Sequence, residues 1–301
     1  MGSDLLFEIG VEEIPPGESP VLARQLREQA ETLIEAERLN FTDIETYHTP
    51  RRLVLVIREL DEEQAEYVTE VRGPSKKAAY DAEGNPTKAA EGFSRGHGIA
   101  VEDLYIKEVS EGEYVFGEKR IPAKATSEVL SVILPKLIDG LSPSETMRWD
   151  ESGIKFIRPI RWIVALFAGS VVEFQYGCIA SGNASRGHRF LGKEQVEVSG
   201  VDDYFKAMTA NGILLSEEER KELITASLKA VSSEIGAEPS LTNTLLHEIA
   251  NNLEHPAPVL GQFPDEFLAL PREILETTIV EHQKFVPFVV GDKPSQYFVG
   301  F

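Results

Sequence analysis

The sequence predicts an α+β fold in which a mixed or antiparallel sheet is built mainly before residue 200 and helices follow. Up to that point, apolar residues gather in short runs bounded by Pro, Gly or charged residues, as is typical of strands. Later, Ser216 and Glu219 form a capping box, and apolar residues recur at helical spacing. At 301 residues the chain is long enough for two domains. We expect a sheet-rich domain over 1–200 and a helix-rich portion packing on it over 201–301.

The first expected strand, residues 5–10, is an apolar run that Pro15-Pro16 stops. A helix should follow, with Ser19 as its N-cap and Pro20 at its first position. Residues 52–57 are apolar on both faces, which predicts a central strand, and residues 66–71 are expected to be its antiparallel neighbour.

The remaining elements are predicted by the same signals. We expect helices over 86–93, 126–137, 216–234, 242–253 and 272–282. We expect a hairpin over 104–107 with 114–116, a strand pair over 162–167 with 171–176, and strands over 286–290 and 297–301. The last run stops at Phe301 inside a strand-like segment, so we expect a fragment of a longer chain.

The charge of the chain is strongly acidic except in one segment. Fifty acidic and 30 basic residues give a net charge of −20, which argues against broad nonspecific binding to nucleic acid. Residues 148–193 nevertheless hold seven Arg and Lys against three Asp and Glu. Guanidinium groups offer planar, bidentate donors to phosphate or carboxylate, so this segment predicts either an anion site or arginines paired with acidic residues elsewhere.

Several functional classes are disfavoured. The N-terminus has neither a cationic segment nor a long apolar one, and no 18 apolar residues run together, so neither a signal peptide nor a membrane span is predicted. The single cysteine, Cys178, cannot form an internal disulfide, which fits a cytoplasmic protein. No metal site is expected, because Asn251 stands where a second histidine would complete a zinc motif with His247.

No nucleotide site or catalytic constellation is predicted either. Residues 187–194 imitate a phosphate-binding loop, but Glu194 replaces the Ser or Thr that would bind magnesium, and a carboxylate there repels phosphate. The sequence contains no Gly-x-Ser-x-Gly motif. We therefore assign no catalytic residue, and we expect no cofactor to be bound by this chain.

Two arginine clusters survive as candidate binding sites. Thr49-Pro50-Arg51-Arg52 places two cations at the start of the central strand, and Arg158-Pro159-Ile160-Arg161-Trp162 repeats the pattern beside an aromatic residue. Such pairs can grip phosphate or stack on a base. The alternative is that the arginines lock onto Glu8, Glu12 or Glu13 near the first strand. We expect Arg161 to be partly buried and structural, and an exposed contact to come from Arg186 or Arg189.

At these residues the sequence resembles the beta subunit of bacterial heterotetrameric glycyl-tRNA synthetase. Six blocks occur in that family's order and span nearly the whole chain. They are Glu8-Ile9-Gly10-Val11-Glu12-Glu13-Ile14-Pro15-Pro16, Thr49-Pro50-Arg51-Arg52-Leu53, Met147-Arg148-Trp149, Arg158-Pro159-Ile160-Arg161-Trp162, Ser181-Gly182-Asn183 with Arg186-Gly187-His188-Arg189-Phe190, and His282-Gln283-Lys284-Phe285. Asp150 departs from the family, which usually has glycine there.

The resemblance implies an assembly of two alpha and two beta chains that joins glycine to its tRNA with ATP and magnesium. In that family the alpha chain carries the active site, and the beta chain supplies tRNA binding and assembly, so we expect this chain alone to be inactive. The resemblance covers only the N-terminal part of the beta chain, which looks similar to the B3/B4 module of the phenylalanyl enzyme. Candidate tRNA contacts are Arg51, Arg52, Arg158, Arg161, Arg186, His188 and Arg189.

Two other functions stay open. A hydrolytic editing domain for mischarged tRNA would need a pocket lined by groups such as His188, Asn183 and Thr49. A purely structural module would use its paired arginines only to hold strands together.

Overall fold

The structure is a computed structural model that describes residues 2–301, and it divides into two units. One unit takes in the chain up to Glu62 and from Ser127 to Phe301, and the other is Glu63–Thr126. The division therefore does not fall at the boundary expected near residue 200. Residues on both sides of that boundary share a core in the first unit, whereas Glu63–Thr126 has a small core of its own.

The first unit is built around a mixed seven-stranded sheet in the order β2-β3-β1-β7-β10-β9, with β8 paired to β7. The pairs β2–β3, β3–β1 and β1–β7 are antiparallel, whereas β10 joins β7 in parallel. Their bounds are Gly2–Val11 (β1), Asp43–Thr49 (β2), Arg52–Asp61 (β3), Ile160–Phe167 (β7), Ser170–Val171 (β8), Gln175–Tyr176 (β9) and Ile179–Gly182 (β10). The first and central strands predicted from the sequence are confirmed.

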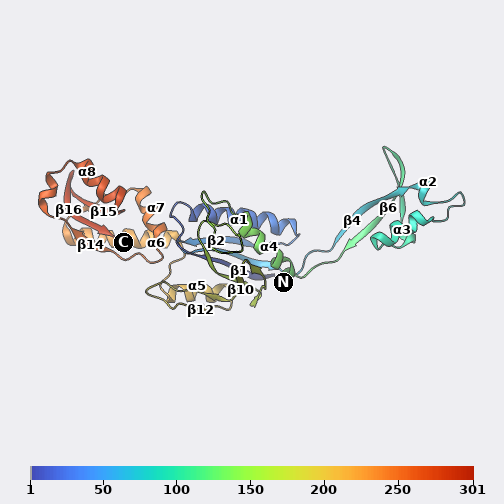
Figure 1. Cartoon of the computed structure of the whole chain (residues 1–301), viewed down its shortest axis with the longest axis horizontal. Helices are drawn as coiled ribbons and strands as arrows, with labels where there is room; N and C mark the ends of the chain where they lie inside the picture. The colour runs from blue at the N-terminus through green and yellow to red at the C-terminus, as the bar shows by residue number, and fades with distance from the viewer. Residues whose placement is uncertain (1) are drawn as a thin grey trace. The chain divides into compact units, whose positions relative to one another are not determined.

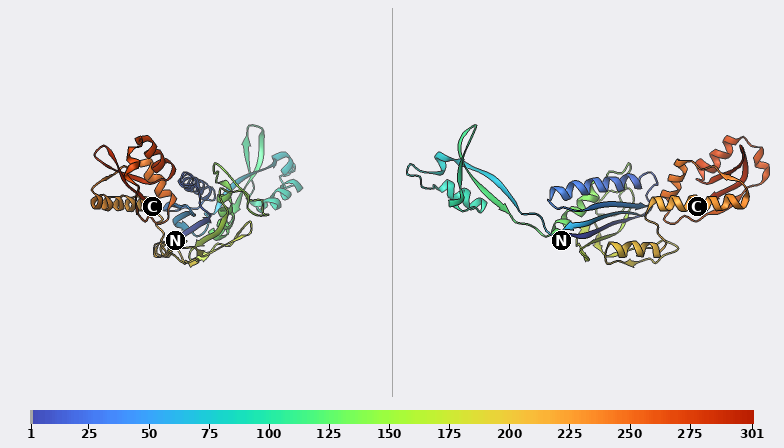
Figure 2. Two further views of the ribbon diagram at one scale, coloured as in Figure 1. Left: turned by 60° about the vertical axis from the view of Figure 1, so that its left-hand side comes forward. Right: turned by 180° about the vertical axis from the view of Figure 1, so that it is seen from behind.

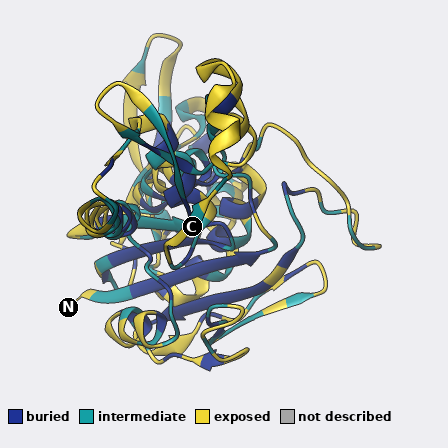
Figure 3. Cartoon of the chain, turned by 90° about the vertical axis from the view of Figure 1, so that its left-hand side faces the viewer, coloured by how far each residue is buried: buried dark blue, intermediate teal, exposed yellow. Residues whose placement is uncertain are grey.

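Helices cover both faces of this sheet, which is why its central strands are apolar on both sides. Helices α1 (Ser19–Ala36) and α4 (Thr126–Gly140) lie on one face, and α5 (Val201–Ala210) lies on the other (Figure 1). The view from behind in Figure 2 shows the same three layers. Figure 3 shows the strands between them as buried ribbon.

Helix α1 follows from an apolar stripe with the period of a helix. Leu22, Leu26, Ala30 and Ile34 recur every four residues, and all four are buried against the sheet. The expected N-cap is wrong by one position, because Glu18 precedes the helix and Ser19 is already its first residue. Helix α4 confirms the helix expected from residue 126.

The second unit holds a three-stranded sheet, two short α-helices and one 3-10 helix, η1. The sheet has the order β4-β6-β5, and the predicted hairpin is formed by its strands β5 and β6. The bounds are Tyr67–Ser75 (β4), Lys76–Ala79 (α2), Lys88–His97 (α3), Val101–Asp103 (η1), Tyr105–Val109 (β5) and Gly112–Ile121 (β6). The expected pairing of residues 66–71 with the central strand is wrong, since β4 pairs with β6, and β2 and β1 fill both edges of β3.

The C-terminal third combines the predicted helices with a small antiparallel sheet around one core. The sheet has the order β13-β15-β16-β14. A small hairpin, Ala184–Ser185 (β11) with Val196–Glu197 (β12), precedes this part. The helices are Glu217–Ile235 (α6), Asn243–Asn252 (α7), the 3-10 helix Asp265–Ala269 (η2), Arg272–Glu276 (α8) and the π-helix Thr277–His282 (η3). The strands are Glu238–Pro239 (β13), Val259–Gln262 (β14), Val286–Val290 (β15) and Lys293–Gly300 (β16). The Ser216 hydroxyl accepts from Glu219 N at 3.3 Å, as the capping box predicts.

Asp150 stabilises the turn where the family usually has glycine. Its carboxylate accepts from the backbone N and the hydroxyl of Ser152 and from the thiol of Cys178, which holds the pKa of Asp150 below its ordinary value. Gly153, three positions later, has a left-handed backbone conformation with φ of 77°. None of the helices within residues 2–301 has the length and apolar character needed to cross a membrane.

Gly10 allows an aromatic ring to lie flat on the sheet. It is the direct partner of both Arg52 and Trp162 in the neighbouring strands, and a Cβ at residue 10 would collide with the Trp162 ring. We expect Gly10→Ala to lower the free energy of unfolding by about 1–3 kcal/mol through overpacking. The matched control is Gly17→Ala, where a Cβ meets nothing within 4 Å. Equal melting temperatures of the two variants would contradict this account.

Candidate nucleic-acid interface over a buried arginine network

The candidate site lies at one end of the main sheet, where four neighbouring strands place functional residues in one row. Register pairs Thr49 of β2 with Arg52 of β3, Arg52 with Gly10 of β1, and Gly10 with Trp162 of β7. Because Gly10 has no side chain, Arg52 and Trp162 can approach each other across it, and the guanidinium carbon of Arg52 lies 5.6 Å from the centroid of the indole.

Arg52 is fully buried and is bound on every side. Its Nη1 donates to Glu8 Oε1 at 3.0 Å and to Ser185 Oγ at 3.3 Å. Its Nε donates to Glu254 Oε1 at 3.0 Å, and its Nη2 donates to the carbonyl of Arg186 at 3.1 Å. The side chains of Arg52 and Glu8 are both 0% exposed. Arg52 is therefore unable to reach an RNA phosphate in this conformation, and the carboxylate lock that the sequence left as an alternative is what the structure shows for this residue.

Glu254 brings a distant part of the chain into this network. The Thr49 hydroxyl donates to Glu254 Oε1 at 2.8 Å, and the Glu254 carbonyl accepts from Leu214 N at 2.9 Å. Although burial opposes ionisation, Arg52 and Thr49 hold the pKa of Glu254 below its ordinary value. Burial likewise works against the charge on Arg52, but Glu254 and Glu8 raise the pKa of its guanidinium further above the usual value. The surroundings thus favour a charged guanidinium paired with an ionised Glu254, whereas burial raises the pKa of Glu8 above its ordinary value.

A second buried arginine, Arg220 on α6, has only neutral oxygen acceptors. It donates to the carbonyls of Ala250, Leu214, Leu215 and His48 at 2.7–3.2 Å. Burial lowers the pKa of Arg220 to about 10, so the group stays cationic at neutral pH. Because His48 belongs to β2 and Ala250 to α7, this residue joins the C-terminal helices to the edge of the sheet.

Three arginines surround the indole of Trp162. The guanidinium carbon of Arg186 lies 5.0 Å from the ring centroid, and that of Arg51 lies 5.7 Å away. Arg51 also faces Glu254 Oε2 at 3.9 Å, and its side chain is 11% exposed. Arg186 is only half-buried. Arg186 therefore forms the partly exposed layer above the fully buried Arg52.

The candidates Arg161 and Arg189 lie outside and share acidic partners. Arg161 Nε donates to Glu12 Oε1 at 2.8 Å, and Arg189 contacts Glu12 at 3.3 Å and Glu13 at 3.1 Å. The expectation that Arg161 is partly buried is wrong, because its side chain is 48% exposed. Arg161 is the second residue of β7, and its side chain is exposed to solvent there.

The other candidates have local roles. Arg158 is half-buried and donates to the neighbouring carbonyl of Ile157 at 2.8 Å. His188 is half-buried, and its Nδ1 accepts from the backbone N atoms of Phe190 and Leu191 at 3.3 and 3.2 Å. Burial, with Arg51 and Arg52 nearby, lowers the pKa of His188, which favours the neutral ring that this bonding needs.

The residues proposed for hydrolytic editing are not arranged for that chemistry. Thr49 is buried, and its hydroxyl is committed to Glu254. The Nδ1 atom of His188 is committed to its own loop, whereas Asn183 is exposed. Within residues 2–301, no group of three or more His, Cys, Asp or Glu side chains could hold a metal ion.

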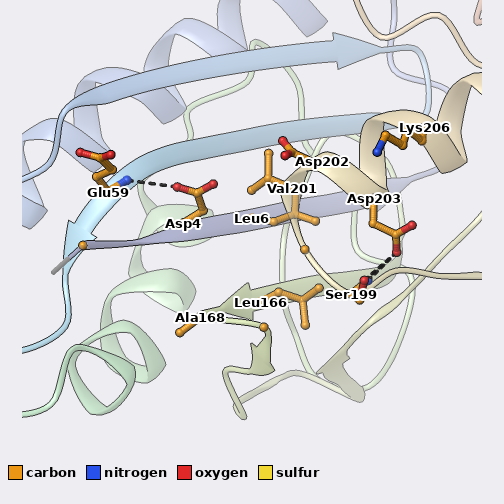
Figure 4. A pocket seen from close by; sticks show the side chains of 13 residues that line it. Asp4, Leu6, Glu59, Leu166, Ala168, Ser199, Val201, Asp202, Asp203 and Lys206 are labelled. Carbon is orange, nitrogen blue, oxygen red and sulfur yellow. Dashed lines mark hydrogen bonds between the residues drawn. The ribbon is translucent and has the colours of Figure 1, made fainter.

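Two cavities adjoin the main sheet, and they differ in charge. One, of about 470 Å³, is bordered by Arg161, Trp162, Ser185, Arg186 and Glu194. The other, of about 670 Å³, is drawn in Figure 4 and carries four carboxylates, those of Asp4, Glu59, Asp202 and Asp203. Because Asp203 caps the backbone of Ser199 and Asp4 accepts from Glu59 N, much of this acidic lining is already used to hold local structure.

Sequence reasoning missed Glu254 and Arg220. Glu254 follows a helix and carries no local signal, because its partners are about 200 residues away along the chain. Arg220 did carry a signal: it occupies the stripe of buried positions that continues to Ile224 and Leu228. A charged residue in line with a buried stripe indicates a satisfied internal cation.

Comparison with known proteins identifies the family of this chain. A family model described as "Glycyl-tRNA synthetase beta subunit" matches residues 5–301. Proteins named glycine--tRNA ligase beta subunit are 39% identical in Desulfitobacterium hafniense over 99% of this chain, 41% identical in Desulforamulus reducens over 97%, and 39% identical in Clostridioides difficile over 99%.

These matches define the class of the protein as a component of an aminoacyl-tRNA synthetase. The chain belongs to the glycyl-tRNA synthetase beta subunit family. It spans 43% of the length of the Desulfitobacterium relative and 44% of the Clostridioides one.

The burial of Arg52 yields a stability prediction. Arg52→Met keeps much of the volume but leaves Glu8 and Glu254 buried without their shared cation, so we expect a loss of about 3–5 kcal/mol in the free energy of unfolding. The control Arg161→Ala removes an exposed ion pair and should cost less than about 1 kcal/mol. Urea denaturation of both variants measures the difference, and equal losses would show that burial of Arg52 carries no special weight.

Proposed function

We propose that this chain is the part of a glycyl-tRNA synthetase beta subunit that contributes tRNA binding and assembly to the ATP-dependent ligation of glycine to its tRNA. Membership of the family supports the reaction, and the arginines over the buried network support the contact with RNA. Catalysis, with ATP and magnesium, belongs to the alpha subunit in this proposal. In the same proposal, the chain assembles with a second beta subunit, is cytoplasmic and has a fold similar to the B3/B4 module.

The observation that carries the RNA contact is the state of Arg186. Within residues 2–301, no carboxylate lies within ion-pair distance of this guanidinium, which rests over the Trp162 ring. Its backbone is also fixed, because its carbonyl accepts from the buried Arg52. A guanidinium that is held in place, partly exposed and not neutralised is suited to bind a phosphate in a bidentate manner.

Arg161 and Arg189 extend the same surface. Both are about half exposed, and their ion pairs with Glu12 and Glu13 are of the kind worth about 0–1 kcal/mol. An RNA phosphate can compete for these side chains at little cost in free energy. Arg52 has no place in the contact itself and serves as the support beneath it.

Binding of tRNA should therefore depend on Arg186. In the complete enzyme, Arg186→Ala should weaken tRNA binding and reduce the slope of log affinity against log salt by about 1, because one phosphate contact is lost. The matched control is Arg27→Ala, an exposed arginine on α1, which covers the opposite face of the sheet. Filter binding across a salt series measures both variants. An unchanged slope for Arg186→Ala, together with unchanged affinity, would contradict the proposed contact.

A further inference from the structure

The loop 187–193 is closed tightly at its base, beside Arg186. Gly187 N donates to the Lys193 carbonyl at 2.8 Å, and Gly192 N donates to the His188 carbonyl at 2.9 Å. The residues that flank this closure on both sides, Arg186 and Glu194, border the cavity of about 470 Å³. The loop therefore stands at the rim of that cavity.

Close packing explains both glycines, which in the sequence imitate a phosphate-binding loop. A Cβ on Gly187 would lie 2.7 Å from the Lys193 carbonyl oxygen, and a Cβ on Gly192 would lie 2.5 Å from the Asn211 carbonyl oxygen. Asn211 follows α5 and also binds the loop directly: its carbonyl accepts from His188 N at 3.0 Å, and its side chain accepts from Lys193 N at 3.1 Å. The glycines serve to seat the loop on α5.

The tip of the loop is fixed by its own side chains. The neutral His188 ring accepts from the two backbone N atoms at the tip, those of Phe190 and Leu191. Arg189 is tied to Glu12 and Glu13. The tip is consequently held by contacts on both sides of Phe190.

This rigid support presents an aromatic ring to solvent. Phe190 is 86% exposed, the highest value among the exposed large apolar residues in the described part of the chain. Leu191, the other apolar residue at the tip, lies close to Gly212, because a Cβ added at Gly212 would be 3.0 Å from the Cβ of Leu191. Phe190 is thus the most exposed apolar side chain at the tip, beside Leu191, which is 62% exposed, and its ring centroid lies 6.2 Å from that of His188.

We propose that Phe190 stacks on an unpaired base of tRNA, while Arg186 binds a phosphate of the same strand. This inference rests on the proposed function and adds to it the part of the RNA that the loop recognises. Exposed aromatic rings beside arginines are a recurrent means of binding single-stranded nucleic acid, because every base offers a face for stacking.

A protein partner fits the loop less well. Protein interfaces of ordinary size need a contiguous, largely desolvated core, and two adjacent exposed side chains, Phe190 and Leu191, are too small to provide one. The cavity at the foot of the loop offers guanidinium groups beside an indole, which suits a phosphate next to a base. The observations therefore favour RNA.

The test measures tRNA affinity of the complete enzyme with Phe190→Ala, Phe190→Leu and Phe190→Trp. Loss of one stacked base should weaken binding about 5- to 150-fold in the Ala variant. Leu keeps an apolar side chain without a ring, so it should behave nearly like Ala, whereas Trp should bind about as well as the wild type. Phe267→Ala, at an exposed phenylalanine in the C-terminal part, is the matched control and should leave affinity unchanged.

A blunt-ended RNA duplex, which offers no unpaired base, is the control ligand. Wild type and Phe190→Ala should bind this RNA equally, because the ring has no base on which to stack. Unequal binding of this RNA by the two proteins, or full affinity of Phe190→Ala for intact tRNA, overturns the inference. Loss of alpha-subunit association without loss of tRNA affinity also overturns it and assigns the ring to a protein contact. If Arg186→Ala weakens tRNA binding and Phe190→Ala does not, only this inference fails, whereas failure of both variants to weaken it removes the proposed function too.

Discussion

The buried guanidinium of Arg52 is the constraint on which the rest of the candidate site depends. Its partners come from parts of the sequence that lie 44, 133 and 202 residues away, those of Glu8, Ser185 and Glu254. Removing charges from water is costly, so such an arrangement persists only when its hydrogen bonds are made together. The planar fork of an arginine suits this task, because it binds several acceptors in fixed directions. The network thereby joins two central strands to the segment that follows α7.

This support divides the arginines into two sets with different tasks. Arg52 and Arg220 lie inside and connect the C-terminal helices to the sheet. Arg186, Arg161 and Arg189 lie partly or largely outside. The two sets touch at one point, where Nη2 of Arg52 binds the carbonyl of Arg186. Arg186 combines a rigid support with a guanidinium that has no carboxylate partner among the described residues, and this suits an RNA contact, since an ordered side chain loses less conformational entropy on binding.

Local signals predicted much of the fold, and nonlocal pairing accounts for the errors. The strand over 52–57 and the capped helix that begins after Ser216 were identifiable because their apolar periodicity and cap are contained in the sequence itself. Strand β2 was missed because its residues are mostly polar and only half-buried, as expected at the edge of a sheet. The partner of the central strand was wrong because the strand next in sequence belongs to a separate unit.

The candidate site was predictable in its residue types and less so in its contacts. Glu8 was identified as a possible partner of the arginines because both are near strand ends, whereas Glu254 has no sequence feature that marks it. The central claim is that Arg52 and Glu254 act together to join the two parts of the first unit. A double-mutant cycle with Arg52→Met and Glu254→Gln, followed by urea denaturation, measures this directly. The account predicts a coupling free energy of at least about 1.5 kcal/mol, and additive losses from the two substitutions would contradict it.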